Sequence, residues 1–273
     1  MGDAGGLDGR GLDVGYHGTV VVHGASIGLR AGVVTALVGP NGSGKSTLLR
    51  ALARLHRPTR GEVVLDDGMA ATALSAKEFA RRVTLLAQSR PTPSGVSVRD
   101  VVAYGRYPYR GRWRGDDPGG AAAIGHAMEI TGITGMADRP VDELSGGERQ
   151  RVWLATCLAQ DTGTLLLDEP TTFLDLRYQV EILDLIRDLA DEHAVAVGVV
   201  LHDLDHAAQV ADHIVLLDAG RVRADGPPAE VLTDAHLSTV YGIRIDVAAD
   251  PVTGALHMRP VGRHTHRVHE PAP

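Results

Sequence analysis

The chain is poor in cysteine and aromatic residues, and it has no long hydrophobic run. Its single cysteine, Cys157, excludes an intrachain disulfide and is typical of a reducing compartment. The longest apolar run, residues 194–201, is far shorter than the roughly 18 residues that would span a bilayer. Residues 1–6 have neither the basic nor the apolar part of a signal peptide. We therefore expect a cytoplasmic protein.

The chain also lacks a basic excess, because its formal net charge is -7. Proteins that bind nucleic acid need basic groups to neutralise phosphates, so we expect no nucleic-acid partner. The 273 residues are enough for one or two domains, and a hydrophobic content of 44% can form a substantial core. With only 4% aromatic residues, that core must be largely aliphatic.

Composition and apolar patterning predict one main domain, residues 11–262, between two short tails. Residues 1–10 are rich in glycine and aspartate without an apolar period, and we expect them to be disordered. From Leu12 onward, short strand-like segments separated by turn signals predict an antiparallel sheet. Glycine and proline punctuate short helical patterns over residues of about 89–160, which indicates an inserted helical subdomain. Residues 263–273 include three histidines; we expect a disordered tail, with a loose metal site as the alternative.

A glycine-rich loop separates a buried strand from a helix. Residues 33–38 are β-branched and aliphatic, and leucines recur at helical spacing from Leu48. In this context the loop amides and the start of the helix can hold phosphate groups. Lys45 is expected to reach the β- and γ-phosphates of a nucleotide, and Ser46 to bind Mg²⁺. The candidate loop consists of Gly39, Pro40, Asn41, Gly42, Ser43, Gly44, Lys45, Ser46 and Thr47.

A second helix begins with two adjacent glycines. Ser145 and Glu148 have the spacing of a capping box, which explains both residues without a ligand. Capping does not explain Gly146 and Gly147. They indicate close approach of a ligand to the backbone at a helix N-terminus, which again suits phosphate.

Three further strands end in polar residues. One buried strand ends in Asp168 and Glu169, and a metal ion held by Ser46 is the partner that such carboxylates need. We expect Asp168 to bind the metal and Glu169 to act on the attacking water. Gln88 and His202 follow two other strands, at the edge where α/β sheets bind ligands. There Gln88 can contact the metal or water and His202 the γ-phosphate; an ordinary loop glutamine and a strand-end histidine are the simpler alternatives.

Two aromatic features have open interpretations. Tyr16 lies in a turn, where its ring could stack on a purine base or simply lie on the surface. A segment that alternates arginine with aromatic residues is either a solvated face or a surface for an acidic loop of a partner; its arginines are Arg106, Arg110, Arg112 and Arg114.

The ordered set of motifs resembles the nucleotide-binding subunit of an ABC transporter over about residues 12–262. The set joins the phosphate loop and strand carboxylates to Gln88, the Leu-Ser-Gly-Gly-Glu signature at 144–148, His202 and Asp175 of the D-loop. The resemblance implies an α/β fold, in which a P-loop NTPase core has an N-terminal antiparallel β subdomain and an inserted helical subdomain carrying the signature. It also implies ATP hydrolysis with Mg²⁺, in which the catalytic residues are Lys45, Gln88, Glu169 and His202.

In this family two subunits enclose two ATP molecules, so the resemblance implies a homodimer. Lys45 and Ser46 of one subunit would face Ser145 and Gly147 of the other across each nucleotide, and Tyr16 would stack on the base. The implied partners are integral membrane permease subunits and, indirectly, a solute-binding protein. Such a chain would lie at the cytoplasmic face of the cell membrane.

Residues 104–108, 169–175 and 250–254 resemble the ferric siderophore importer branch. Tyr109 and Tyr178 replace histidines that are common there, and cobalamin and haem importers share most of the pattern, so those cargoes remain alternatives. A soluble ABC ATPase that acts on DNA or ribosomes would need a long coiled-coil insertion, tandem ATPase domains or a basic surface, which the sequence lacks. A nucleotide switch without turnover is disfavoured by the intact strand carboxylates.

Overall fold

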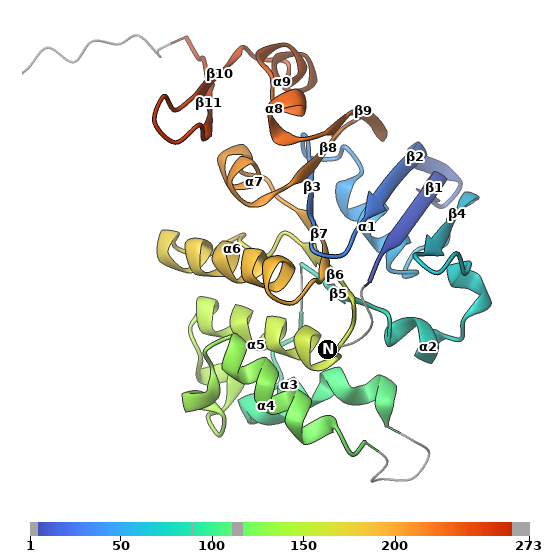
Figure 1. The fold of residues 1–273 in the computed structure, drawn as a ribbon, viewed down its shortest axis with the longest axis vertical. Helices are drawn as coiled ribbons and strands as arrows, with labels where there is room; N and C mark the ends of the chain where they lie inside the picture. The colour runs from blue at the N-terminus through green and yellow to red at the C-terminus, as the bar shows by residue number, and fades with distance from the viewer. Residues whose placement is uncertain (1–4, 89, 111–116, 264–273) are drawn as a thin grey trace, which may run out of the picture.

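A six-stranded sheet forms the centre of the computed structural model, which describes residues 5–88, 90–110 and 117–263 (Figure 1). Its strand order is β5-β6-β7-β3-β8-β9. The first five strands in that order are parallel, and β9 pairs antiparallel with β8 at the edge. The strands are β3 (Val34–Val38), β5 (Val83–Leu86), β6 (Thr164–Asp168), β7 (Ala196–Val200), β8 (His213–Asp218) and β9 (Arg221–Gly226).

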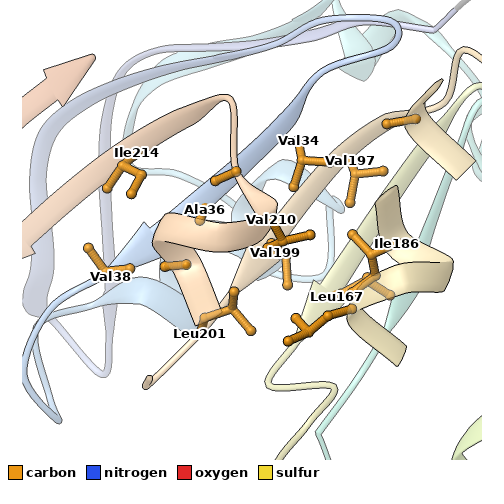
Figure 2. Close-up of a cluster of buried hydrophobic side chains, with 14 of the residues drawn as sticks. Val34, Ala36, Val38, Leu167, Ile186, Val197, Val199, Leu201, Val210 and Ile214 are labelled. Carbon is orange, nitrogen blue, oxygen red and sulfur yellow. The ribbon is translucent and has the colours of Figure 1, made fainter. Parts of the chain in front are cut away.

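The central strands are buried on both faces, as continuous aliphatic sequence predicts for a parallel sheet. Every residue of β3, β6 and β7 is buried. One face packs against α6 (Leu176–Asp191) and α7 (Leu204–Val210), and Figure 2 shows part of that core. The other face packs against α1 (Lys45–Leu52) and a second sheet. Burial on both sides fixes where the central strands end.

The second sheet is antiparallel, as predicted, with strand order β2-β1-β4. The prediction that residues 1–10 are disordered is wrong for residues 7–10, because β1 begins at Leu7, which is fully buried. The alternation of apolar and polar residues that marks a strand is interrupted by Gly9. This glycine lies on the buried face, where an added Cβ would be 2.8 Å from Leu12. The strands are β1 (Leu7–Tyr16), β2 (Thr19–Leu29) and β4 (Arg60–Leu65).

The helical region between β5 and β6 has a hydrophobic cluster of its own, which includes Val101, Met128 and Val152. Other residues of the last helix, such as Leu154, belong to the core of the central sheet and so join the two parts. The main elements are α3 (Val98–Val102), the 3-10 helix η2 (Ala103–Tyr109), α4 (Gly120–Ile130) and α5 (Gly146–Ala159). Shorter elements are η1 (Ala71–Ala73), α2 (Ala76–Ala80), η3 (Thr134–Met136) and η4 (Val141–Glu143).

Arg106 has neither of the two roles considered for its segment. Its side chain is buried and donates to the Asp117 carboxylate from Nε at 2.9 Å and from a terminal nitrogen at 2.8 Å. It also donates to the Ala159 carbonyl, so it ties η2 to the end of α5. Arg112 and Arg114 lie outside the described residues.

The chain after the central sheet consists of two short helices and a hairpin. They are α8 (Pro228–Val231), α9 (Asp234–Tyr241), β10 (Ile245–Ala249) and β11 (Leu256–Pro260). The hairpin contacts α7 and extends the core on that face of the sheet. The histidine tail lies outside the described residues from position 264 onward. Within the described ranges, no helix combines the length and the apolar character needed to cross a bilayer.

Candidate nucleotide-binding site

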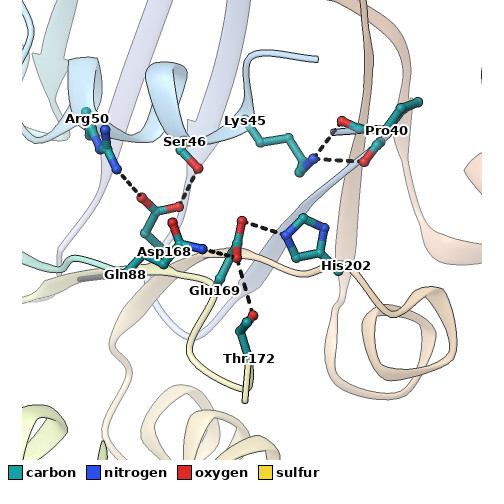
Figure 3. A network of polar contacts seen from close by, with 10 residues as sticks. Pro40, Lys45, Ser46, Arg50, Gln88, Asp168, Glu169, Thr172 and His202 are labelled. Carbon is teal, nitrogen blue, oxygen red and sulfur yellow. Dashed lines mark hydrogen bonds and ion pairs between the residues drawn. The ribbon is translucent and has the colours of Figure 1, made fainter. Parts of the chain in front are cut away.

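The carboxyl ends of four neighbouring strands meet at one edge of the central sheet, and each is followed by a residue or loop singled out in the sequence (Figure 3). The phosphate loop follows β3, Gln88 follows β5, Asp168 ends β6 and His202 follows β7. Parallel strands place these groups together because their carboxyl ends share one edge. The structure thus gathers the P-loop, both carboxylates, the glutamine and the histidine into one site.

The phosphate loop presents an open helix N-terminus. Gly44 is the N-cap of α1, with a φ of 100°, and no side chain caps the first amides of the helix. Gly42 also has positive φ, 79°, which a residue with a side chain rarely adopts. The Ser43 hydroxyl is buried without a hydrogen-bond partner. Free amides, a helix dipole and an unpaired hydroxyl together fit a phosphate group.

Lys45 is buried at the first position of α1 and turns back onto its own loop. Its Nζ donates to the carbonyl oxygens of Gly39 at 2.8 Å and Pro40 at 2.9 Å. Burial lowers the pKa of Lys45, and the negative charges of Glu169 and Asp168 oppose that shift. The ammonium group is therefore held where an anionic ligand would relieve the cost of its burial.

Ser46 and Asp168 form the oxygen pair expected of a magnesium site. The Ser46 hydroxyl donates to Asp168 Oδ1 at 2.6 Å, and Asp168 is fully buried. Arg50 contacts the other carboxylate oxygen at 3.2 Å. Arg50 was not singled out in the sequence, although its place one helical turn after Ser46 puts it on the same face of α1. A hydroxyl and a carboxylate oxygen are suitable ligands for Mg²⁺.

Glu169 is held by three donors, as Figure 3 shows. His202 Nε2 lies 2.5 Å from Oε1, while Gln88 Nε2 at 2.5 Å and Thr172 Oγ1 at 3.3 Å contact Oε2. Glu169 also has a φ of 55°, a conformation that costs energy in a residue with a side chain. Thr172 was not singled out in the sequence, because only the turn after β6 brings it to the carboxylate.

The signature residues have their contacts within α5 and with the neighbouring helix α6. Ser145 accepts from the Glu148 amide at 3.3 Å and donates its own amide to that carboxylate at 2.8 Å, which is the predicted capping box. An added Cβ on Gly147 would lie 2.3 Å from the ring of Tyr178, whereas Gly146 has open space. Packing against Tyr178 therefore explains the second glycine, which the sequence analysis attributed to a ligand.

Asp175 and Tyr16 have structural partners too. Asp175 is the N-cap of α6 and accepts from the Tyr178 amide at 3.1 Å. Tyr16 is 38% exposed, and its ring centroid lies 4.2 Å from that of His56. A pocket of about 160 Å³ adjoins the phosphate loop and is lined by Val21, Asn41, Gly42, Gly44, Lys45, Ser46, Thr47, Glu169 and His202.

Comparison with known proteins agrees with this geometry. The family model for ABC transporters matches residues 22–172. The ferric enterobactin transport ATP-binding protein of Escherichia coli (strain K12) is 44% identical over 94% of both chains. The hemin import ATP-binding protein of Rhodococcus jostii (strain RHA1) is 46% identical over 92% of this chain and 84% of that protein.

Comparison with solved structures also indicates an ABC transporter fold. A structure of an inward-facing metal-chelate type ABC transporter superposes with a TM-score of 0.82 at 26% identity. The match covers 95% of this chain and 98% of the other. The chain therefore belongs to the ABC transporter family, and its fold is that of the family's ATPase cassette.

Proposed function

We propose that this chain hydrolyses ATP to power an importer. The observation that carries the proposal is the convergence of an open helix N-terminus, a buried lysine and two carboxylates at one sheet edge. In that site the Ser46 hydroxyl oxygen lies 2.6 Å from Asp168 Oδ1, and Glu169 directly follows Asp168 in the sequence. These groups supply phosphate binding, metal ligands and a base, which are the parts that phosphoryl transfer to water requires.

Lys45 and the loop amides hold the phosphates. The Lys45 ammonium donates to two carbonyl oxygens, and phosphate oxygens can replace them as stronger, charged acceptors. The amides at the start of α1 point to the same place. Together these donors stabilise the charge that spreads over the γ-phosphoryl oxygens in the transition state.

Glu169 orients the attacking water and accepts its proton. Its oxygens also accept from Gln88, Thr172 and His202, and these donors fix the direction of the carboxylate toward the water. Gln88 lies between β5 and the inserted helical subdomain. Movement of that subdomain can therefore draw Gln88 from the carboxylate and couple hydrolysis to a change of shape.

Mg²⁺ fits the Ser46 hydroxyl and the Asp168 carboxylate, and when bound it would neutralise charge on the β- and γ-phosphates. Arg50 holds the second oxygen of Asp168 and so keeps the first one directed at Ser46. Gln88 uses its amide nitrogen toward Glu169, which leaves its carbonyl oxygen as the group that can face the metal.

The complete ATPase is a homodimer. Ser145 and Gly147 lie against Glu148 and Tyr178 of their own chain, and the proposal places the phosphate loop that they complete in a second copy. Across each nucleotide, Lys45 of one subunit then faces the signature of the other. Asp175, at the start of α6, lies between the two sites of such a dimer, and Tyr16 stacks on the adenine base.

The dimer acts on separate integral membrane permease subunits at the cytoplasmic face of the membrane, and a solute-binding protein delivers the cargo. A ferric siderophore is the proposed cargo, which the likeness to the enterobactin transport protein supports. Haem is the second candidate, favoured by 46% identity to the hemin import protein. Cobalamin is a third outcome of the same test.

ATPase activity of the chain copurified with its permease tests the proposal. Binding proteins loaded with ferric siderophore, haem or cobalamin are added in turn, and phosphate release is measured. Stimulation by ferric siderophore alone is the expected result, whereas stimulation by another ligand would replace the cargo and keep the ATPase. Absence of a copurifying membrane protein would contradict the importer role, and absence of turnover would contradict the enzyme.

A further inference from the structure

Residues 234–261, named here the C-terminal brace, form one unit of α9 and the β10–β11 hairpin (Figure 1). The Val247 amide donates to Asp234 Oδ1 at 2.7 Å, and the Ile245 amide donates to Ser238 Oγ at 2.9 Å. Ile245 is also buried in the core. These bonds fasten the hairpin to the helix, so the two elements can act together.

The hairpin of the brace is attached to the first turn of α7. Met258 is buried, and its amide donates to Asp205 Oδ1 at 2.9 Å. His257 Nδ1 lies 4.0 Å from the same oxygen. Met258 also belongs to the hydrophobic cluster that contains Ala207 and Val210 of α7. A polar bond and apolar packing thus hold α7 against the brace.

The position of α7 decides the position of His202. Asp203 is the N-cap of this helix and accepts from the His206 amide at 3.0 Å, so His202 stands immediately before the cap. α7 has only seven residues, and a helix this short is not stable without tertiary contacts. The bond between Met258 and Asp205 therefore helps to keep His202 at its 2.5 Å contact with Glu169.

We propose that the C-terminal brace positions one part of the nucleotide site, with Asp205 acting through α7 on His202. Asp205 is a positioning residue, because it acts through other residues and not on the nucleotide. The inference rests on the proposed ATPase function.

Steady-state ATP hydrolysis by the full chain tests the contact between Asp205 and Met258. Asp205→Ala should lower kcat about fivefold with little change in KM, which corresponds to one hydrogen bond of about 1 kcal/mol. Asp205→Asn keeps an acceptor oxygen for the Met258 amide and should restore kcat. Val252→Ala, in the exposed hairpin turn, is the matched control.

Amide hydrogen exchange supplies a readout that does not need hydrolysis. Residues 204–210 should exchange faster in Asp205→Ala than in the wild type or in Asp205→Asn. If kcat and exchange are unchanged in Asp205→Ala, or if Asp205→Asn is equally impaired, the positioning role is wrong. A wild-type chain without turnover would instead contradict the proposed function, and the exchange experiment would still decide the inference.

Discussion

Lys45 combines burial with charge, and this determines what its removal should do. Its ammonium group donates hydrogen bonds to two loop carbonyl oxygens. Lys45→Ala should therefore change the stability of the fold little, but it removes the main donor to phosphate. At 100 times Kd, ATP should stabilise the wild type by about 2.7 kcal/mol, or roughly 5–10 °C in Tm. Lys45→Ala should show no such shift in a thermal melt. An unchanged ATP-dependent shift would contradict the assigned role.

The buried Arg106–Asp117 pair should matter for folding rather than for catalysis. Arg106→Ala leaves the Asp117 carboxylate without its bidentate partner and should lower the free energy of unfolding by about 3 kcal/mol. Arg99→Ala, at an exposed position of α3, should change it little. Urea denaturation measures both. Equal stability of the two variants would show that the pair contributes nothing.

The same pair gives a pH dependence with a definite sign. The hydrogen bond from Arg106 holds the pKa of Asp117 below its ordinary value, so the charged form is favoured in the folded protein. Its stabilisation is complete above about pH 4 and disappears as pH falls through the lowered pKa. The stability difference between wild type and Asp117→Asn should therefore shrink in acid, as urea melts across this range can measure.

Residues whose chemistry is tied to a fixed spacing could be predicted from the sequence, and their partners could not. Lys45, Ser46 and the strand carboxylates stand next to element boundaries that the apolar pattern marks, and parallel strands must bring those boundaries together. The spacing places Arg50 on the same face of α1 as Ser46, but its contact with Asp168, like that of the Tyr178 ring with Gly147, depends on how the elements pack. No local pattern in one sequence records that packing.

At the level of elements, the contact between α5 and α6 at Gly147 is the tightest around the signature. Gly147→Ala would place a Cβ 2.3 Å from the Tyr178 ring, so α6 must shift or the ring must leave. Overpacking of this kind costs about 1–3 kcal/mol. We expect a corresponding loss of stability in denaturant melts.

A double variant separates this steric effect from any other loss. Tyr178→Ala removes the ring, so adding it to Gly147→Ala should recover much of the lost stability relative to the sum of the single changes. Gly146→Ala is the matched control, since its position is open and alanine favours a helix. Strict additivity of the two changes would show that the ring is not what Gly147 accommodates.

Elements with a strong apolar period were predictable, and those interrupted by glycine were not. The strands of the parallel sheet read as short aliphatic runs, and all of them are present. β1 was missed at its start because Gly9 occupies an inward position. β2 runs through what the sequence marked as a turn, because a bulge near Gly24, with a φ of 59°, keeps the strand paired on both sides.

At the scale of the whole molecule, the proposed dimer requires each chain to present half of each of two sites. Its phosphate loop and carboxylates meet at the sheet edge, while its signature is held by α6. Next to Asp175 in the sequence, Phe173 is 97% exposed and Leu176 is 73% exposed. Large apolar side chains this exposed indicate a surface that another protein covers. A second copy of the chain would cover it in the proposed dimer.

Glu169→Gln should make the ATP-bound form of the proposed dimer more stable than it is in the wild type. Glutamine keeps the shape of the side chain but cannot accept the proton of the attacking water, so turnover should fall by at least about a hundredfold while ATP still binds. In size-exclusion chromatography the variant should elute as a dimer with ATP and as a monomer without it. Glu192→Gln, at an exposed position, should behave as wild type.

A second substitution tests the contact between the two subunits. Adding Phe173→Asp to Glu169→Gln buries a charge in that contact and should return the ATP-bound variant to a monomer. Normal hydrolysis by Glu169→Gln would refute the catalytic role, whereas an ATP-bound monomer with no turnover would leave that role intact and refute the dimer.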